Sequence, residues 1–194
     1  MRFLVRLSKG TDVSPADRSQ LGREAYEAVR KFGADVGNLR ISSSAVELDL
    51  LLDSETELQN AVAALEHKFG SLLTIRKLDV ESLPIEDAEA IKMGLELFNQ
   101  ERYWESHEAL EYAWRRSSGS EKCVLQGIIL LAAALVHLQK NERDVAFSIM
   151  QRAHSKIFDY EGGFFGFDIT ALKKNVQRML SSGRVDFFRI ETRQ

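Results

Sequence analysis

The chain has 194 residues, of which 44% are hydrophobic and 28% are charged, a composition typical of globular proteins with room for one domain or two. Its formal net charge is −3, so it lacks the basic excess that most nucleic-acid-binding proteins carry. The single cysteine, Cys123, excludes an intramolecular disulfide and a cysteine-based zinc finger. Because Cys123 lies in an apolar run, we expect a buried structural thiol rather than a nucleophile.

The N-terminus has no signal-peptide pattern, since Met1–Val5 alternates apolar and polar residues and soon becomes polar. The most apolar run, from Cys123 to Leu138, is interrupted by Gln126 and His137 and is short for a membrane span. We therefore expect a cytoplasmic protein without membrane contact, in which this run forms a buried core helix.

Residues 1 to 80 predict the element order strand, helix, strand, strand, helix, strand. Alternating apolar residues predict the strands, and apolar residues at helical spacing predict the helices. Ser14 and Ser54, each with an acidic residue three positions later, are expected to cap the two helices. The βαββαβ order is that of a ferredoxin-like domain.

The sheet face that the helices leave open bears on RNA binding, because RNA-recognition motifs stack bases on aromatic residues there. On the two central strands this face is expected to carry Arg2, Leu4, Arg6, Glu47, Asp49 and Leu51. Carboxylates at two of these positions would repel phosphate. We therefore expect the face to serve docking or homo-dimerisation, and nucleic acid is disfavoured as a partner.

From residue 84 onward every predicted element is a helix. Apolar spacing predicts about five helices between residues 84 and 183, forming an all-α bundle and giving an α+β protein as a whole. A glycine- and phenylalanine-rich loop over 161–167 precedes the last helix. The apolar tail, residues 184–194, is expected to dock on the protein.

A weak internal repeat lies within this helical region. Asn99–Arg102 leads into one predicted helix and Lys140–Arg143 into another, so the two segments are offset by 41 positions in the sequence. Two helical hairpins are too few for a solenoid, and a bundle is favoured.

The most informative segment is the helix expected to begin at Tyr103. At about 100° per residue, several of its residues fall within roughly 120° of one face. These are Trp104, His107, Glu108, Glu111, Trp114 and Arg115. An ordinary amphipathic helix would turn aliphatic residues toward the core and leave carboxylates in solvent. Carboxylates and an imidazole beside two indoles therefore indicate a functional face.

Three of these side chains suit a divalent metal. His107 and Glu111 are four residues apart and Glu108 and Glu111 are three apart, so all three can reach one point. Imidazole and carboxylate ligands suit Mn, Fe or Zn, although further ligands would have to come from elsewhere. In the structural alternative, the glutamates pair with nearby arginines and His107 packs on a neighbouring tryptophan.

The next helix contributes two polar residues, Gln126 and His137, which share one face. They are about 16 Å apart along the helix and cannot bind one ion. In a short antiparallel hairpin, Glu111 should lie near Gln126 and Asn99 near His137. We therefore place Gln126 in the ligand-binding site and expect Asn99 and His137 to be structural.

These two helices resemble a prokaryotic family known as domain of unknown function 309, over about residues 88–153. The likeness rests on Asn99, Tyr103, His107, Glu108, Glu111, Trp114, Arg115, Gln126, Ala132, Ala133, Ala134 and His137. It implies an all-α bundle and a predicted, not established, metal-dependent hydrolase activity. Two positions depart from the family pattern, with Glu101 in place of a usual Gly and Ser106 in place of a usual Ala.

Two functional hypotheses follow, and the sequence leaves open whether the protein is an enzyme. In the first, a metal-dependent hydrolase, a divalent metal or a catalytic water is held by His107, Glu108 and Glu111. Its ligand-binding residues would be Tyr103, Trp104, Trp114, Arg115 and Gln126. In the second, a non-catalytic module binds a small molecule or a protein, and the polar face holds the helices in register.

Overall fold

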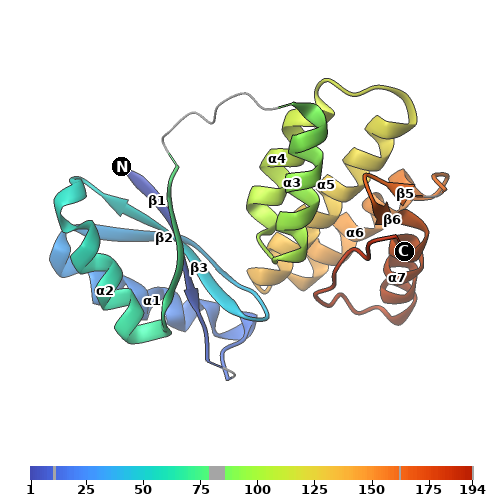
Figure 1. The fold of residues 1–194 in the computed structure, drawn as a ribbon. Helices are drawn as coiled ribbons and strands as arrows, with labels where there is room; N and C mark the ends of the chain where they lie inside the picture. Colours follow the sequence, from blue (N-terminus) through green and yellow to red (C-terminus); the bar gives the residue numbers. More distant parts are fainter. Residues whose placement is uncertain (11, 79–85, 162, 194) are drawn as a thin grey trace. The chain divides into compact units, whose positions relative to one another are not determined.

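The computed structural model describes residues 1–10, 12–78, 86–161 and 163–193. The chain forms two compact units, the first with the elements from β1 to β4 and the second with those from α3 to α7 (Figure 1). The predicted α+β class is therefore confirmed. The expected domain boundary at residues 80–84 lies outside the described residues.

The first unit is an antiparallel sheet which, within the described residues, has four strands in the order β2-β3-β1-β4. This is the strand order of the predicted ferredoxin-like fold. The central strand β1 pairs with both β3 and β4, so that Val5 lies opposite Leu48 and Ile75. The strands are β1 Arg2–Ser8, β2 Ala34–Ile41, β3 Ala45–Leu52 and β4 Leu72–Lys77.

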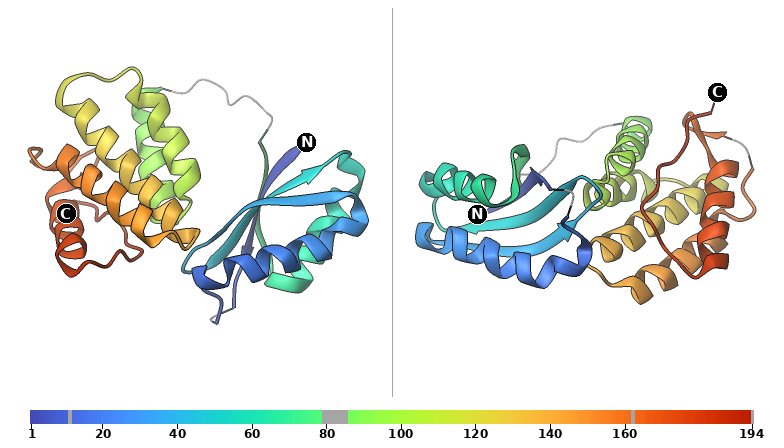
Figure 2. Two further views of the ribbon diagram at one scale, coloured as in Figure 1. Left: turned by 180° about the vertical axis from the view of Figure 1, so that it is seen from behind. Right: turned by 90° about the horizontal axis from the view of Figure 1, so that it is seen from below.

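Two helices, α1 (Arg18–Val29) and α2 (Leu58–Phe69), cover one face of this sheet (Figure 2). Short 3-10 turns flank them, at Pro15–Asp17, Arg30–Phe32 and Glu55–Glu57. Ser14 N–H donates to Asp17 Oδ2 at 2.8 Å, as the capping prediction requires. The Ser54 hydroxyl instead accepts from Thr56 N–H, so the second helix has a simpler cap than the predicted box.

The opposite face of the sheet carries a network of ion pairs. Arg40 Nε lies 2.6 Å from Glu47 Oε1, and its Nη2 lies 3.2 Å from Asp49 Oδ1. Asp49 also accepts hydrogen bonds from Arg2 and from the Asn38 amide. Oppositely charged side chains on neighbouring antiparallel strands therefore pair on this face.

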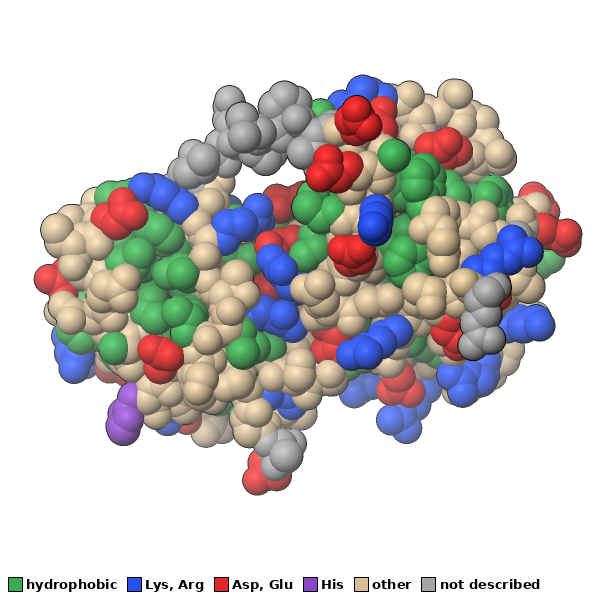
Figure 3. All heavy atoms as spheres, viewed as in Figure 1, with side chains coloured by type: hydrophobic (Ala, Val, Ile, Leu, Met, Phe, Trp, Pro, Cys, Tyr) green, Lys and Arg blue, Asp and Glu red, His purple; other side chains and the backbone are tan. Residues whose placement is uncertain are grey.

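The edge strand β4 exposes aliphatic side chains. Leu73 is 51% exposed and Ile75 is 37% exposed. In Figure 3 hydrophobic side chains gather between α2 and β4 on the viewed face of this unit. An edge strand has neighbours on one side only, so its side chains are covered less than those of β1 or β3.

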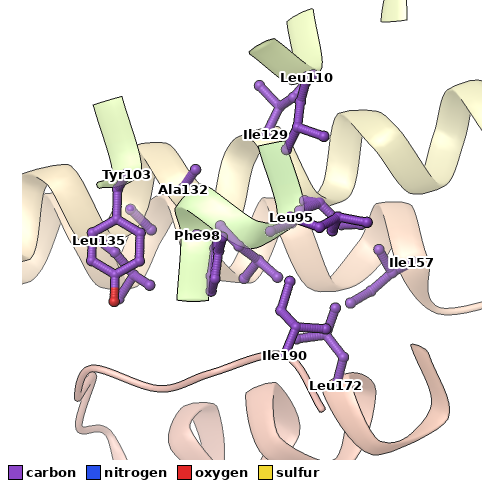
Figure 4. Packing of buried hydrophobic residues seen from close by; sticks show 14 of the residues in the cluster. Leu95, Phe98, Tyr103, Leu110, Ile129, Ala132, Leu135, Ile157, Leu172 and Ile190 are labelled. Carbon is purple, nitrogen blue, oxygen red and sulfur yellow. The ribbon is translucent and has the colours of Figure 1, made fainter. Parts of the chain in front are cut away.

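Within the described residues the second unit has five α-helices, as predicted. They are α3 Asp87–Asn99, α4 Tyr103–Trp114, α5 Gly119–Gln139, α6 Arg143–Ile157 and α7 Ile169–Ser182. Their apolar sides form one hydrophobic cluster (Figure 4). Where the sequence predicted only a loop, Gly163–Phe164 (β5) and Phe167–Asp168 (β6) pair as a small antiparallel hairpin.

The central helix α5 is longer than its apolar run suggested. It has 21 residues, and its most apolar window has a mean hydropathy of 1.7, which by length and composition alone would allow a membrane span. Of that window, 56% is buried inside the protein, as in a core helix. The expectation for Cys123 is wrong, because this thiol is exposed. Val124 and Leu125 point toward the core, and Cys123 precedes them on the other side of the helix.

The internal repeat appears as two equivalent turns. Glu101 (φ 59°) and Asn141 (φ 62°) both adopt the left-handed conformation at the ends of α3 and α5. The following residue in each turn donates its N–H to a carbonyl five positions earlier, Arg102 to Leu97 and Glu142 to His137. This is the hydrogen bond of a Schellman cap. The two left-handed residues, Glu101 and Asn141, are therefore offset by one residue less than the 41 positions between the matching sequence segments.

The C-terminal tail lies across the helical unit after α7. Val185 and Ile190 are buried, at 4% and 1% exposure. Further on, Thr192 forms an isolated bridge with Phe167, next to the β5–β6 hairpin. The apolar content of the tail is therefore accounted for by packing.

Candidate functional site

The helix α4 turns one side toward the core and presents the predicted functional residues on the neighbouring side. Its core side consists of Tyr103, Ser106, Leu110 and Ala113, each 0% exposed. Figure 4 shows two of these, Tyr103 and Leu110, among the packed hydrophobic residues. The motif residues are therefore lateral, at the border between the core and solvent.

Accessibility varies across this lateral face. Trp104, His107, Glu111 and Trp114 are half-buried, whereas Glu108 and Arg115 are exposed. The Glu111 side chain is 36% exposed and that of His107 is 30% exposed. The face is therefore accessible, and its carboxylates are not sealed inside the bundle.

Glu111 lies at the centre of this face and contacts both neighbours on its helix. Its Oε1 accepts a hydrogen bond from Arg115 Nη2 at 3.0 Å, and its Oε2 lies 4.0 Å from His107 Nδ1. The His107 ring is nearly parallel to that of Trp104, with 6.2 Å between centroids. These are the arginine pairing and tryptophan packing that the structural alternative predicted.

Three buried polar atoms along this part of α4 have no hydrogen-bond partner among the described residues. They are His107 Nδ1, Trp114 Nε1 and Ser106 Oγ. An indole N–H can only donate, so Trp114 needs an acceptor. A buried donor left without an acceptor costs about 1–3 kcal/mol. The Trp114 indole N–H can therefore donate a hydrogen bond to an acceptor oxygen from outside the described residues.

Two cations lie near the C-terminal end of α4. Lys122 was not identified from the sequence, and Arg116, expected as a partner of the glutamates, binds Asp87 instead. Lys122 Nζ lies 4.7 Å from the Trp114 ring centroid, and the Arg116 guanidinium lies 3.6 Å from that of Tyr112. Hydrogen bonds to Asp87, at 2.5 and 2.7 Å, raise the pKa of Arg116 above its ordinary value. Lys122 is eight positions after Trp114, across a turn, so helical spacing could not have paired them.

Asn99 and His137, which were expected to lie near each other, have other partners. His137 Nδ1 hydrogen-bonds Glu142 Oε2 and so secures the α5–α6 turn. Asn99 binds the main chain of Ile190 in the tail. The two side chains are structural, but each fastens a different segment, because the long-range partner of Asn99 comes from the C-terminus. Gln126 is half-buried on α5.

The predicted metal ligands do not form a cluster of three. In the part of the chain that the structure describes, no group of three His, Cys, Asp or Glu side chains could hold one ion. Helical spacing brings His107 and Glu111 together, whereas Glu108 is exposed.

Comparison with known proteins bears on the helical unit. Residues 91–149 match the family model described as "Domain of unknown function (DUF309)". A conserved hypothetical protein from Thermus thermophilus, TTHA0068, is 33% identical, and the match covers 46% of this chain and 94% of that one at a TM-score of 0.40. The chain belongs to the DUF309 family. No curated protein matches it.

The DUF309 segment runs from α3 into α6, and the structure shows why a glycine would suit position 101. Glu101, which stands where a glycine is usual, has the left-handed φ of 59° that glycine adopts most easily. The second departure, Ser106, places a hydroxyl where the resemblance predicts the methyl group of an alanine. That hydroxyl is one of the buried atoms without a partner among the described residues.

Proposed function

We propose that this DUF309 protein is a binding module whose ligand contacts the lateral face of α4. The ligand is a small molecule, or a side chain of another protein, that offers an oxygen acceptor beside an apolar surface. One observation carries the proposal: Trp114 Nε1 is buried, and no acceptor for it is found among the described residues.

The neighbouring groups complement such a ligand. The Trp114 ring and the ring pair of Trp104 and His107 offer apolar surface. The Lys122 ammonium over the Trp114 ring favours a negatively charged or strongly polarised oxygen at the indole. Glu111 can accept from a donor on the same ligand. The best match is therefore a carboxylate or amide attached to a flat apolar group.

The experiment follows the two indole N–H resonances by NMR while benzoate, benzamide and indole-3-acetate are added to the full chain. Binding at this face should shift the Trp114 resonance. Trp114→Phe keeps the ring and removes the N–H, so it should weaken binding at least tenfold, whereas Trp104→Phe is the matched control that should preserve it. An unaltered Trp114 resonance with all three compounds would contradict the proposal.

A second candidate is the metal-dependent hydrolase, favoured by the 4.0 Å approach of His107 Nδ1 to Glu111 Oε2. These two groups would supply two ligands to Zn²⁺ or Mn²⁺, and substrate or further protein groups would supply the others. Thermal unfolding with each metal tests this. A rise in melting temperature that disappears in both His107→Ala and Glu111→Gln supports the metal site. An unchanged melting temperature with both metals argues against it.

A further inference from the structure

The tail contacts the α3–α4 turn through side chains rather than through sheet pairing. The Phe187 ring stacks on Tyr103, with 6.1 Å between centroids and 15° between planes, and Phe188 lies 5.4 Å from Phe98. Ile190 enters the hydrophobic cluster, where Figure 4 shows it beside Leu172. The turn thus offers two aromatic contacts, and the hydrophobic cluster of the helical unit receives Ile190.

Asn99 binds the main chain of this segment. Its Nδ2 donates to Ile190 O at 2.9 Å, and its Oδ1 accepts from Ile190 N at 2.7 Å. One amide side chain therefore satisfies both polar groups of one residue, as a neighbouring β-strand would. Such a contact is made to the main chain and does not depend on the side chain of the bound residue. The choice of side chain comes from the hydrophobic cluster, in which Ile190 is buried.

We propose that Phe98, Asn99 and Tyr103 form a recognition site for an extended peptide of the pattern Phe-Phe-x-Ile. The tail occupies this site as an intramolecular ligand, and a segment of the same pattern from another protein chain can displace it. The site differs from the lateral face of α4, because Tyr103 belongs to the core side of that helix.

Two observations support exchange rather than permanent attachment. Residues 185–190 adopt no helix or strand, and within the described residues their main chain makes no hydrogen bond to another main chain. Main-chain hydrogen bonds hold the tail only beyond this segment, from Asp168 N to Glu191 O and from Arg193 N to Gly166 O. Segments held in this way open more easily than core helices. In addition, Asn99 and Tyr103 lie inside the DUF309 segment, 91–149, whereas the tail lies outside it. The site therefore belongs to the family domain, and the tail is an occupant that this chain supplies.

The test adds a fluorescent peptide with the sequence of residues 185–193 to the full chain and measures anisotropy. In the wild type, the tethered tail competes at an effective concentration in the millimolar range. The full-chain variant Phe187→Ala/Phe188→Ala weakens that competitor, so it should bind the peptide at least tenfold more tightly. A folded variant that binds no more tightly than the wild type would overturn the proposal.

Specificity is tested in the same variant. Adding Asn99→Ala should weaken peptide binding at least tenfold, whereas Asn175→Ala on α7 is the matched control and should leave it unchanged. A peptide with alanine at both phenylalanine positions should also bind at least tenfold more weakly. Equal binding of the two peptides would show that no recognition of this pattern occurs.

Hydrogen exchange on the wild type gives an answer even where the tail variant fails to fold. A displaceable tail should let the Ile190 amide exchange at least 100-fold faster than the amides of α5. If Ile190 exchanges as slowly as α5, the tail opens only on global unfolding and the proposal fails.

Discussion

At the scale of the residue, Glu101 occupies a position that its own backbone preference opposes. Its φ of 59° places it in the left-handed region, which costs a non-glycine residue roughly 1 kcal/mol. We expect Glu101→Gly to raise the free energy of unfolding by about 0.5–1 kcal/mol, measured by urea titration. Asn141→Gly, in the equivalent turn, should change it less, because asparagine tolerates this conformation. A larger gain at Asn141 would contradict the argument.

The buried hydroxyl of Ser106 is expected to lower the stability of the helical unit. The Ser106 side chain is fully buried, and Oγ has no partner among the described residues. Ser106→Ala removes this polar atom without creating a large cavity, so stability should increase by about 1 kcal/mol. Thermal and urea unfolding would measure the gain. A loss of stability would mean that the hydroxyl has a partner in solution, such as a bound water.

Replacing Glu111 distinguishes a structural role of the α4 face from a functional one. The ion pair of Glu111 with Arg115 is exposed, and exposed ion pairs contribute only about 0–1 kcal/mol. Glu111→Gln should therefore change the free energy of unfolding by less than about 0.5 kcal/mol, while any ligand or metal binding at this face should be lost. Calorimetric melting combined with the NMR titration tests both parts. A large drop in melting temperature would identify Glu111 as part of the scaffold.

At the scale of the element, a glycine fixes the close packing of α3 against α4. A methyl group at Gly94 would lie 2.6 Å from Leu110 Cγ, well inside van der Waals contact. Gly94→Ala should therefore lower the free energy of unfolding by about 1–3 kcal/mol despite the better helix propensity of alanine. Combining it with Leu110→Ala should cost less than the sum of the two single changes, because the clash is removed.

The control for this prediction is another helical glycine in open space. Gly22 lies within α1, and a methyl group there would meet nothing within 4 Å. Gly22→Ala should thus raise stability by about 0.5–1 kcal/mol, the ordinary propensity gain. If Gly94→Ala were also stabilising, the packing of α3 on α4 would have to be looser than the contact distance implies.

At the scale of the whole molecule, the two units have separate hydrophobic clusters. A unit with its own core can fold alone, so we expect residues 86–193 to form a stable helical domain when expressed separately. Both tryptophans lie on α4, so their fluorescence reports on this unit alone. The fluorescence transition in urea should have the same midpoint, within about 0.5 M, in the fragment and the full chain. An unfolded fragment would contradict this prediction.

Most helices and strands could be predicted from the sequence, because helix and strand periodicity and end caps depend on residues close together in the chain. The sequence predicted the βαββαβ order, the five helices and the unusual face of α4. The partners of the polar residues and their exposure could not be predicted in this way, because they depend on how the helices pack in the folded protein. Asn99 binds Ile190, 91 residues away, and Lys122 reaches Trp114 across a turn. Such contacts depend on how helices pack, and so does the exposure of Glu111, because the direction of a helical face relative to the core is set by its neighbours.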